Sequence, residues 1–259
     1  MSVTSWNVRF LSHRPEEDVQ DVGRRPRALI ILDQPFVRTL LERLWNSCAL
    51  HCCADGGANR LYDTFADDPK TRSVFVPNLI KGDLDSIRDE VRAYYAGKEV
   101  PIVHDEDQGA TDLMKCVAAI EEKERIEGTL PHDIVLLGGL AGRLDHTIHT
   151  LSYLHRLRKT RPRTFAVTDD NVGWVLDSGE HVIHIDHDLL GRTCGLLPVG
   201  IDETILTTSG LRWNLNNTPS SFDGLVSTSN HLVPEENEVR VKTTKPIWWT
   251  VQLKPEAFK

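Results

Sequence analysis

Residues 28–167 alternate between short apolar runs and longer segments in which apolar residues recur at helical spacing. The apolar runs, each suited to a strand buried on both faces, are 28–32, 50–54, 100–103, 134–137 and 164–167. The helical segments are 37–45, 86–96, 111–124 and 144–158. This order predicts an α/β fold with a mostly parallel sheet that is covered on both faces. In such sheets, ligands bind beyond the carboxyl ends of the strands.

The helical spacing disappears after residue 170. The segments that follow are short, rich in β-branched and aromatic residues, and separated by Gly, Pro and Asn; they are 181–186, 204–208, 225–228, 239–243 and 248–253. Residues 239–242 alternate between valine and a basic side chain, as in a half-exposed strand. Trp248 and Trp249 are neighbours, so a strand places one indole on each face. This part of the chain is predicted to form a small antiparallel β-sandwich domain.

The length of the chain predicts a division into parts. A chain of 259 residues exceeds the roughly 100–150 residues of a typical single domain. We expect a polar, loosely held N-terminal extension at 1–26, an α/β domain at 27–170 and a β-sandwich domain at 171–259. The core of such a chain can be large, so folding needs no disulfide or metal.

Composition and charge exclude several classes of function. The chain has 30 basic and 38 acidic residues, a net charge of −8 and no basic patch, which argues against nucleic acid as a partner. It has no run of about 20 apolar residues, so no membrane partner is expected. Residues 1–10 lack the order of a secretory signal. Five cysteines without paired spacing favour free thiols in a reducing compartment, so the expected location is cytoplasmic.

An acidic protein of this kind can handle phosphates through a few placed groups or a bridging cation, and the sequence GDLDS at 82–86 is the first candidate. In an extended chain, Asp83 and Asp85 point to the same side, and they repel each other unless a cation neutralises them. Mg²⁺ prefers one or two carboxylates together with phosphate oxygens and water. The pair therefore indicates a metal–phosphate site, although an acidic turn that caps a helix has the same composition.

A second polar cluster, at 105–112, opens the helix that follows the third predicted strand. A helix N-terminus offers free N–H groups and the positive end of the helix dipole. Thr111 or Asp112 can simply cap this helix, but the cluster, which also contains Gln108, has more polar groups than one cap needs. If its strand neighbours the strand before the first acidic pair, Asp112 completes a three-carboxylate site for Mg²⁺.

Glycine-rich turns follow two further strands. Three glycines within 138–142 mark backbone that turns sharply or touches a ligand. Arg143 adds a planar donor fork suited to phosphate, and Asp145 either caps the next helix or accepts a hydrogen bond. The turn is neither a Walker A loop nor a dinucleotide fingerprint. Asp55, followed by two glycines, can hold a ribose or an amine, although a tight turn has the same sequence.

Two segments of the β-rich part carry polar and aromatic residues. Trp213 can stack on a flat heteroaromatic ring, and Ser227 can orient the polar edge of such a ring. Taken by themselves, these residues favour a structural interpretation, in which Trp213 lies in the core of the sandwich and Ser227 supplies turn polarity.

Six motifs occur together in the order found in thiamine pyrophosphokinases. They are CADGGANRLYD at 53–63, GDLDS at 82–86, DQGATD at 107–112, GGLAGRLD at 138–145, SGLRWNL at 209–215 and LVSTSN at 225–230. The sequence resembles a eukaryotic member of this family over residues 27–255. The extension at 1–26 lies outside the resemblance.

The resemblance implies an enzyme that transfers the pyrophosphoryl group of ATP to the hydroxyl of thiamine, giving thiamine diphosphate and AMP. It implies Mg²⁺ as the cofactor and ATP as the co-substrate. It also implies a homodimer with the thiamine site near the interface. Residues 27–170 would then bind ATP and Mg²⁺, and residues 171–259 would bind thiamine.

The resemblance also implies a set of site residues. The implied Mg²⁺ ligands are Asp83, Asp85 and Asp112, which with Arg143 form the catalytic set. The residues implied to surround ATP are Asp55, Gln108, Thr111 and Arg143. The residues implied in the thiamine pocket are Asp145, Trp213 and Ser227. For the general base, Asp85 and Asp112 are both candidates.

Two other classes of function fit parts of the sequence. A non-catalytic thiamine or nucleotide sensor would keep the fold, but its mark would be a broken carboxylate set, and here all three aspartates are present. A nucleotide-sugar transferase with an Asp-x-Asp motif is a weaker alternative, because the β-rich part with Trp213 does not suggest a sugar acceptor.

Overall fold

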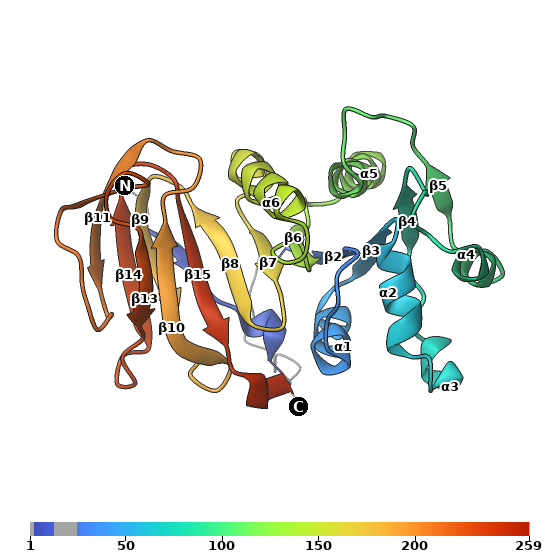
Figure 1. The fold of residues 1–259 in the computed structure, drawn as a ribbon, viewed down its shortest axis with the longest axis horizontal. Coiled ribbons are helices and arrows are strands. Elements are labelled where there is room, and N and C mark those ends of the chain that lie inside the picture. The colour runs from blue at the N-terminus through green and yellow to red at the C-terminus, as the bar shows by residue number, and fades with distance from the viewer. Residues whose placement is uncertain (1–2, 13–24, 259) are drawn as a thin grey trace.

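The computed structural model describes residues 3–12 and 25–258, and the first half of the chain forms a sheet with helices on both faces (Figure 1). The parallel strands of this half are β2 (Arg27–Ile31), β3 (Leu50–Ala54), β4 (Leu79–Gly82), β5 (Ile102–His104), β6 (Asp133–Leu137) and β7 (Thr164–Val167). The helices are α1 (Arg38–Ser47), α2 (Gly57–Thr64), α3 (Pro69–Arg72), α4 (Asp89–Ala96), α5 (Asp112–Glu127) and α6 (Leu144–Leu157). The predicted α/β fold is confirmed.

Strand β2 shows why helices cover both faces of this sheet. Leu29 and Ile31 point into a core that they share with α1, α2 and α4, whereas Ala28 and Ile30 point into a core shared with α5 and α6. All four side chains are fully buried. The continuous apolar run of the sequence therefore reflects a strand that has no face in contact with water.

The strands after residue 170 form a β-sandwich with the predicted antiparallel pairings. They are β8 (Asn171–Leu176), β9 (Gly179–His184), β10 (Leu190–Leu197), β11 (Glu203–Ser209), β12 (Thr218–Ser221), β13 (Ser227–His231), β14 (Glu238–Thr243) and β15 (Ile247–Leu253). The alternation along β14 is confirmed, because its two valines are buried and its two basic side chains are exposed. Trp248 and Trp249 are buried in different core clusters, one on each face of β15.

One sheet runs through both halves of the molecule. Strand β8 pairs antiparallel with β7, so among the described residues the larger sheet has ten strands, in the order β13-β10-β15-β8-β7-β6-β2-β3-β4-β5. The boundary expected at residue 170 falls in the turn between β7 and β8. Because the hydrogen-bonded ladder continues across this turn, the orientation of the sandwich relative to the α/β half follows from strand pairing.

The N-terminal segment requires a correction. The loose polar extension predicted for residues 1–26 is wrong for residues 3–12, where β1 (Thr4–Trp6) pairs in parallel with β9 and completes the second sheet, in the order β1-β9-β14-β11-β12. A short 3₁₀ helix (Arg9–Leu11) follows. Trp6, Val8, Phe10 and Leu11 are buried in the main core. These apolar residues are too few to show a periodic pattern. Residues 13–24 lie outside the described part of the chain.

Two sequence-based expectations concern the whole chain. All five cysteines are buried and free of disulfides, as their spacing predicted. Within the described residues, the helices are too short or too polar to span a bilayer.

Candidate active site

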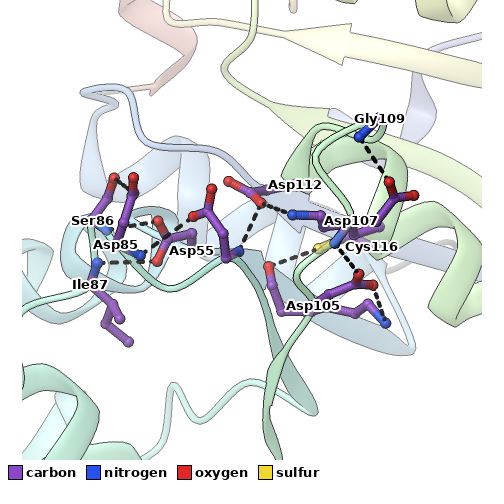
Figure 2. A network of polar contacts seen from close by, with 12 residues as sticks. Asp55, Asp85, Ser86, Ile87, Asp105, Asp107, Gly109, Asp112 and Cys116 are labelled. Carbon is purple, nitrogen blue, oxygen red and sulfur yellow. Dashed lines mark hydrogen bonds and ion pairs between the residues drawn. The ribbon is translucent and has the colours of Figure 1, made fainter.

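Three aspartates meet at the carboxyl ends of neighbouring parallel strands. Asp55 follows β3, Asp83 follows β4, and Asp112 opens α5 after β5, the strand that pairs with β4. The condition under which Asp112 joins the first acidic pair, that their strands are neighbours, is therefore met. Each aspartate offers a carboxylate oxygen within 4.8 Å of the other two. Figure 2 shows Asp55 and Asp112 directed toward the same region between the loops.

Gly82 permits this close approach. A Cβ atom at this position would lie 2.7 Å from Cβ of Asp55 and 2.9 Å from Oδ1 of Asp112. Such contacts are shorter than van der Waals packing allows, so a side chain here would push the carboxylates apart. The backbone N–H of the next residue, Asp83, donates to Oδ1 of Asp112 at 3.2 Å. The glycine therefore allows the strand end and the helix start to share one small site.

Asp55 has a structural role in addition to its charge. Its side chain is 2% exposed, and its carboxylate accepts the backbone N–H groups of Ser86 at 2.9 Å and Ile87 at 3.1 Å. Burial raises the pKa of Asp55, and these two hydrogen bonds oppose that effect. The bonds tie the end of β3 to the loop after β4. Ser86 therefore lies in this loop, and it does not cap α4, which begins three residues later at Asp89.

Asp85 lies apart from the three clustered carboxylates. Leu84 has φ +60°, a left-handed conformation, so the extended chain predicted for this motif is wrong. The side chains of Asp83 and Asp85 consequently do not project together as they would from a strand. Oδ1 of Asp85 accepts the hydroxyl of Ser86 at 2.8 Å, and its backbone N–H donates to Oδ1 of Asp83 at 3.4 Å.

Two lysines offset part of the negative charge around the site. Nζ of the buried Lys115 lies 3.4 Å from Oδ1 of Asp112. Nζ of Lys81, on β4, lies 3.0 Å from Oδ2 of Asp105. The hydrogen bond from Lys81 lowers the pKa of Asp105. Figure 2 shows Asp105 and Asp112 in this group of polar contacts. The site therefore contains both signs of charge and carries a surplus of carboxylates.

The turn before α5 keeps two predicted ATP contacts accessible. Gln108 and Thr111 are both exposed. Thr111 occupies the N-cap position, but its hydroxyl makes no capping hydrogen bond. Asp107 closes the turn by accepting the backbone N–H of Gly109 at 2.8 Å. The polar side chains of this turn therefore exceed what the helix end uses.

A glycine loop (residues 138–142) follows β6 and carries Arg143 and Asp145. Gly138, Gly139 and Gly142 have φ of +101°, +89° and +77°, which glycine adopts readily. Nη2 of Arg143 lies 2.6 Å from Oδ2 of Asp145, and both side chains are exposed. The hydrogen bond from the guanidinium lowers the pKa of Asp145. These two predicted ligand contacts therefore bind each other.

Two polar residues just after β2 contact helix α2 on one side and the glycine loop on the other, and the motifs of the sequence did not include them. Asp33 forms an ion pair with Arg60 of α2, with Oδ1 and Nε 2.7 Å apart. Gln34 bonds to the glycine loop through its side-chain amide. Their position after a buried strand was the signal that could have revealed them.

The predicted thiamine contacts Trp213 and Ser227 lie far from the aspartates. Trp213 is 52% exposed, so the structural interpretation that placed it in the sandwich core is wrong. Its backbone carbonyl accepts a hydrogen bond, 2.8 Å long, from the side-chain amide of Asn230 in β13. Ser227 is buried at the start of the same strand. β13 is one edge of the ten-stranded sheet, and β5, beside the acidic cluster, is the other (Figure 1).

The fold and the site define a class of protein. An α/β sheet carries an acidic cluster and a glycine loop with an arginine at its strand ends, and a β-sandwich extends the same sheet. All-oxygen carboxylate groups suit a divalent cation, and an arginine fork suits phosphate. The class is therefore a two-part α/β protein suited to a nucleotide and a metal ion.

Comparison with known proteins identifies the family. Residues 41–166 match the family "Thiamin pyrophosphokinase, catalytic domain", and residues 180–248 match "Thiamin pyrophosphokinase, vitamin B1 binding domain". Thiamine pyrophosphokinase 3 of Oryza sativa subsp. japonica is 40% identical over 235 residues, which cover 88% of this chain and 87% of that protein. Thiamine pyrophosphokinase of Saccharomyces cerevisiae is 30% identical, and the match covers 88% of this chain and 83% of that protein.

A solved structure agrees with these matches. The crystal structure of yeast thiamin pyrophosphokinase has a TM-score of 0.84 at 29% sequence identity, covering 99% of this chain and 93% of that one. The chain belongs to the thiamine pyrophosphokinase family.

Proposed function

We propose that this protein catalyses the reaction after which its family is named. It transfers the pyrophosphoryl group of ATP to the hydroxyl of thiamine and gives thiamine diphosphate and AMP. The observation that carries this proposal is the 40% identity over 88% of the chain, which spans both halves of the fold. The clustered carboxylates support catalysis over a purely binding role, because a sensor has no need of three acidic groups held within 4.8 Å.

The acidic cluster fits Mg²⁺. Its donors are all carboxylate oxygens, which Mg²⁺ prefers, and one or two carboxylates suffice when phosphate oxygens complete the coordination. The glycine at position 82 leaves the space between the aspartates open. We assign Asp83 and Asp112 as the principal ligands. Asp85 is a third ligand by family resemblance, and the buried Asp55 adds negative charge. Mg²⁺, when bound, neutralises charge on the phosphate oxygens.

The groups proposed to hold ATP come from two loops, the turn before α5 and the glycine loop. Gln108 and Thr111 offer an exposed amide and a hydroxyl beside the cluster. Arg143 reaches from the glycine loop. When ATP binds, one of its phosphate groups takes the place of Asp145 on the guanidinium, so the arginine remains paired. Asp145 is then free to contact thiamine. Charge-assisted bonds of this kind are stronger than neutral ones.

The transfer step follows from these assignments. The hydroxyl oxygen of thiamine forms a bond to the β-phosphorus, the bond from that phosphorus to the oxygen of the α-phosphate breaks, and AMP leaves. The hydroxyl proton passes to a carboxylate, with Asp85 and Asp112 as the candidates. The interaction of Arg143 with the phosphate oxygens strengthens in the transition state, because negative charge develops on these oxygens there. As in other phosphoryl transfers, positioning contributes much of the acceleration.

We propose that the protein works as a homodimer with thiamine bound near the interface. Trp213 and Ser227 lie at the opposite end of the sheet from the acidic cluster, so a second copy can bring them to it. Large apolar side chains are exposed on both surfaces involved. In the sandwich they are Trp213, Phe222 and Leu225, and on α6 they are Leu144 and Ile148. Exposed apolar groups of this kind are typical of interfaces.

We also propose a cytoplasmic location. Its support is chemical, because all five cysteines are free, and free thiols persist in reducing compartments.

An assay of the purified protein tests the function. With ATP, Mg²⁺ and thiamine present, we expect thiamine diphosphate and AMP to form in equal amounts, and we expect no product when Mg²⁺ or thiamine is omitted. Tight binding of thiamine and ATP without product would instead support a sensor. Absence of both binding and product would sink the proposal.

A further inference from the structure

We propose that Gln34 is a positioning residue that holds the glycine loop and thereby aims Arg143 at the phosphates of ATP. The inference rests on the proposed function, because it takes Arg143 as an ATP contact. It concerns a residue outside the six motifs.

The location of Gln34 is the first observation. Strand β2 lies between β3 and β6, and the chain fills the sheet on one side of β2 before it returns to the other side. Ligands of open α/β sheets bind in the crevice at such a switch of direction. Gln34 follows the end of β2 and the glycine loop follows the end of β6, so the two segments flank this switch point.

The second observation is a set of three hydrogen bonds from one side chain to the glycine loop. Oε1 of Gln34 accepts the backbone N–H groups of Gly139 at 2.9 Å and Ala141 at 3.3 Å. Nε2 donates to the carbonyl of Ala141 at 2.5 Å. The side chain is 9% exposed. A single buried amide therefore acts as donor and acceptor toward the same turn, and an unsatisfied buried amide would be costly.

The third observation is that the loop folds around this amide. A Cβ atom at Gly138 would lie 3.3 Å from Cβ of Gln34, and one at Gly142 would lie 3.7 Å from Nε2. Both glycines have positive φ in the folded protein. Glycine has wide conformational freedom in the unfolded chain. A flexible segment of this kind needs an external contact to adopt one conformation.

The consequence concerns Arg143, two residues after Ala141. Its side chain is 72% exposed and pairs with Asp145, which is itself 63% exposed. The backbone that Gln34 holds therefore sets the direction in which the side chain of Arg143 leaves the loop. The N–H groups of Gly139 and Ala141 are occupied by Gln34, so phosphate recognition by this loop falls to the arginine side chain and not to those backbone groups.

A double-mutant cycle tests this coupling. The variants are Gln34→Met, which keeps the size of the side chain and removes its hydrogen bonds, Arg143→Ala, and the combination of both. The measurement is ATP affinity by calorimetry with Mg²⁺ and without thiamine. We expect Gln34→Met to weaken binding about tenfold, comparable to the loss of a net hydrogen-bond contribution. We expect the double variant to bind within about twofold of Arg143→Ala alone, because coupled residues are not additive.

Controls separate positioning from general destabilisation. Gln252→Met makes the same chemical change on an exposed position of β15 and should leave ATP affinity unchanged. If Gln34→Met does not fold, Gln34→Asn replaces it, because asparagine keeps the amide, adds no charge and shortens the side chain by one methylene group, which withdraws the amide from the loop. The inference is overturned if the fold-losses of ATP affinity in the two single variants multiply in the double variant, which means that their free energies add. An unchanged ATP affinity in Gln34→Met also overturns it.

The outcome is distinguishable from failure of the proposed function. Product formation by the unaltered protein together with additive losses overturns only the role of Gln34. A non-additive cycle in a protein that binds ATP but forms no thiamine diphosphate supports that role and overturns only the proposed reaction.

Discussion

Individual backbone positions decide how the acidic cluster forms. Asp55 has φ +40° and Leu84 has φ +60°, both in the left-handed region that non-glycine residues rarely adopt. Such conformations persist where the surrounding structure compels them, and they concentrate at functional sites. Here two backbone N–H bonds to the carboxylate of Asp55 hold the loop that contains Leu84. The strained backbone thus supports the placement of Asp83.

Substitution of Gly82 by alanine tests the space between the carboxylates. The added methyl group would lie 2.9 Å from Oδ1 of Asp112, so we expect Gly82→Ala to lower kcat on the order of a hundredfold by displacing charge-stabilising groups. Gly97→Ala is the matched control, because Gly97 has φ −66° and its added Cβ would meet only ordinary contacts at 3.4 Å. Steady-state assays compare the two. Full activity in Gly82→Ala would contradict the proposed crowding.

Removal of one carboxylate tests the metal assignment. We expect Asp83→Asn to weaken Mg²⁺ binding in calorimetry and to lower kcat about a hundredfold or more, because an amide carries no charge to offset that of the cation. Asp67→Asn alters an exposed aspartate outside the site and should change neither quantity. Unchanged Mg²⁺ affinity in Asp83→Asn would show that the ion binds elsewhere.

At the scale of elements, the short strand β1 joins the N-terminus to the sandwich. Trp6 stacks on Trp174, with ring centroids 5.7 Å apart, and contacts Phe165 edge-on at 6.1 Å. Its indole N–H donates to Nδ1 of His181 at 3.1 Å. Trp174 and Phe165 belong to β8 and β7, so this strand covers the junction between the two halves of the large sheet.

Truncation of this tryptophan measures what β1 contributes. We expect Trp6→Ala to lower the free energy of unfolding by about 3–5 kcal/mol, the usual cost of a large buried aromatic side chain. Val3→Ala, at a half-exposed position of the same segment, should change it by less than about 0.5 kcal/mol. Urea titrations give both values. A loss of less than about 0.5 kcal/mol in Trp6→Ala would mean that β1 adds little to stability.

His181 makes this junction sensitive to pH. Burial lowers the pKa of His181 below its ordinary value of about 6.5. The neutral ring accepts from Trp6 through Nδ1 and donates to the carbonyl of Asp177 through Nε2, 2.8 Å away. Below about pH 6.5 the unfolded chain binds a proton that the folded chain resists, so stability present above this pH is lost as the pH falls.

A pair of histidine variants isolates this effect. We expect His181→Gln to show a smaller loss of unfolding free energy between pH 7 and pH 5 than the unaltered protein. His146→Gln, at an exposed position on α6, should show the unaltered dependence. Urea titrations at several pH values provide the comparison. The same slope in all three proteins would assign the acid sensitivity to other groups.

At the scale of the whole molecule, the ten-stranded sheet separates two groups of proposed site residues. The aspartates lie at the β3–β5 end, and at the other end Ser227 lies in β13 and Trp213 lies next to it. Because strand pairing continues across the sheet, bending of one chain does not readily bring these ends together. This separation supports the proposed homodimer, in which a site that uses both groups would draw them from two copies of the chain.

Mixing two inactive variants tests this arrangement. Asp83→Asn removes a ligand from one end and Trp213→Ala removes the proposed stacking surface from the other. When equal amounts exchange subunits at random, half of the dimers are mixed and each contains one intact site, so we expect about a quarter of the unaltered activity. Unfolding and refolding the mixture, followed by the assay, measures it. No recovery would place both residues in a site within one subunit.

Much of the fold could be predicted from local patterns. The apolar run of β2 and the buried stripe of α5, which includes Cys116, follow from periodicity because both elements are buried in a regular way. The strands β8, β10 and β12 were not predicted. β10 contains Gly191 and Gly195, which have no side chain to pack, and it forms because β13 and β15 pair with it on both sides.

The candidate site could be predicted in part for the same reason. Asp83 and Asp112 were identified because acidic residues after buried strands suit a cation. Their meeting point depends on the pairing of β4 with β5, which is a long-range contact. Asp85 follows the left-handed Leu84 and falls outside the group of three carboxylates, and Gln34 contributes through bonds to a loop more than 100 positions further along the chain.

The sequence by itself therefore determined many of the elements, the chemical nature of the donors and the family, because these depend on local periodicity and on ordered motifs. The tertiary structure decided which donors meet. It gathered Asp55, Asp83 and Asp112 at one strand end, paired Arg143 with Asp145, and exposed Trp213. These outcomes depend on strand order and loop conformation, which arise from contacts between residues far apart in the chain, and no local pattern encodes them.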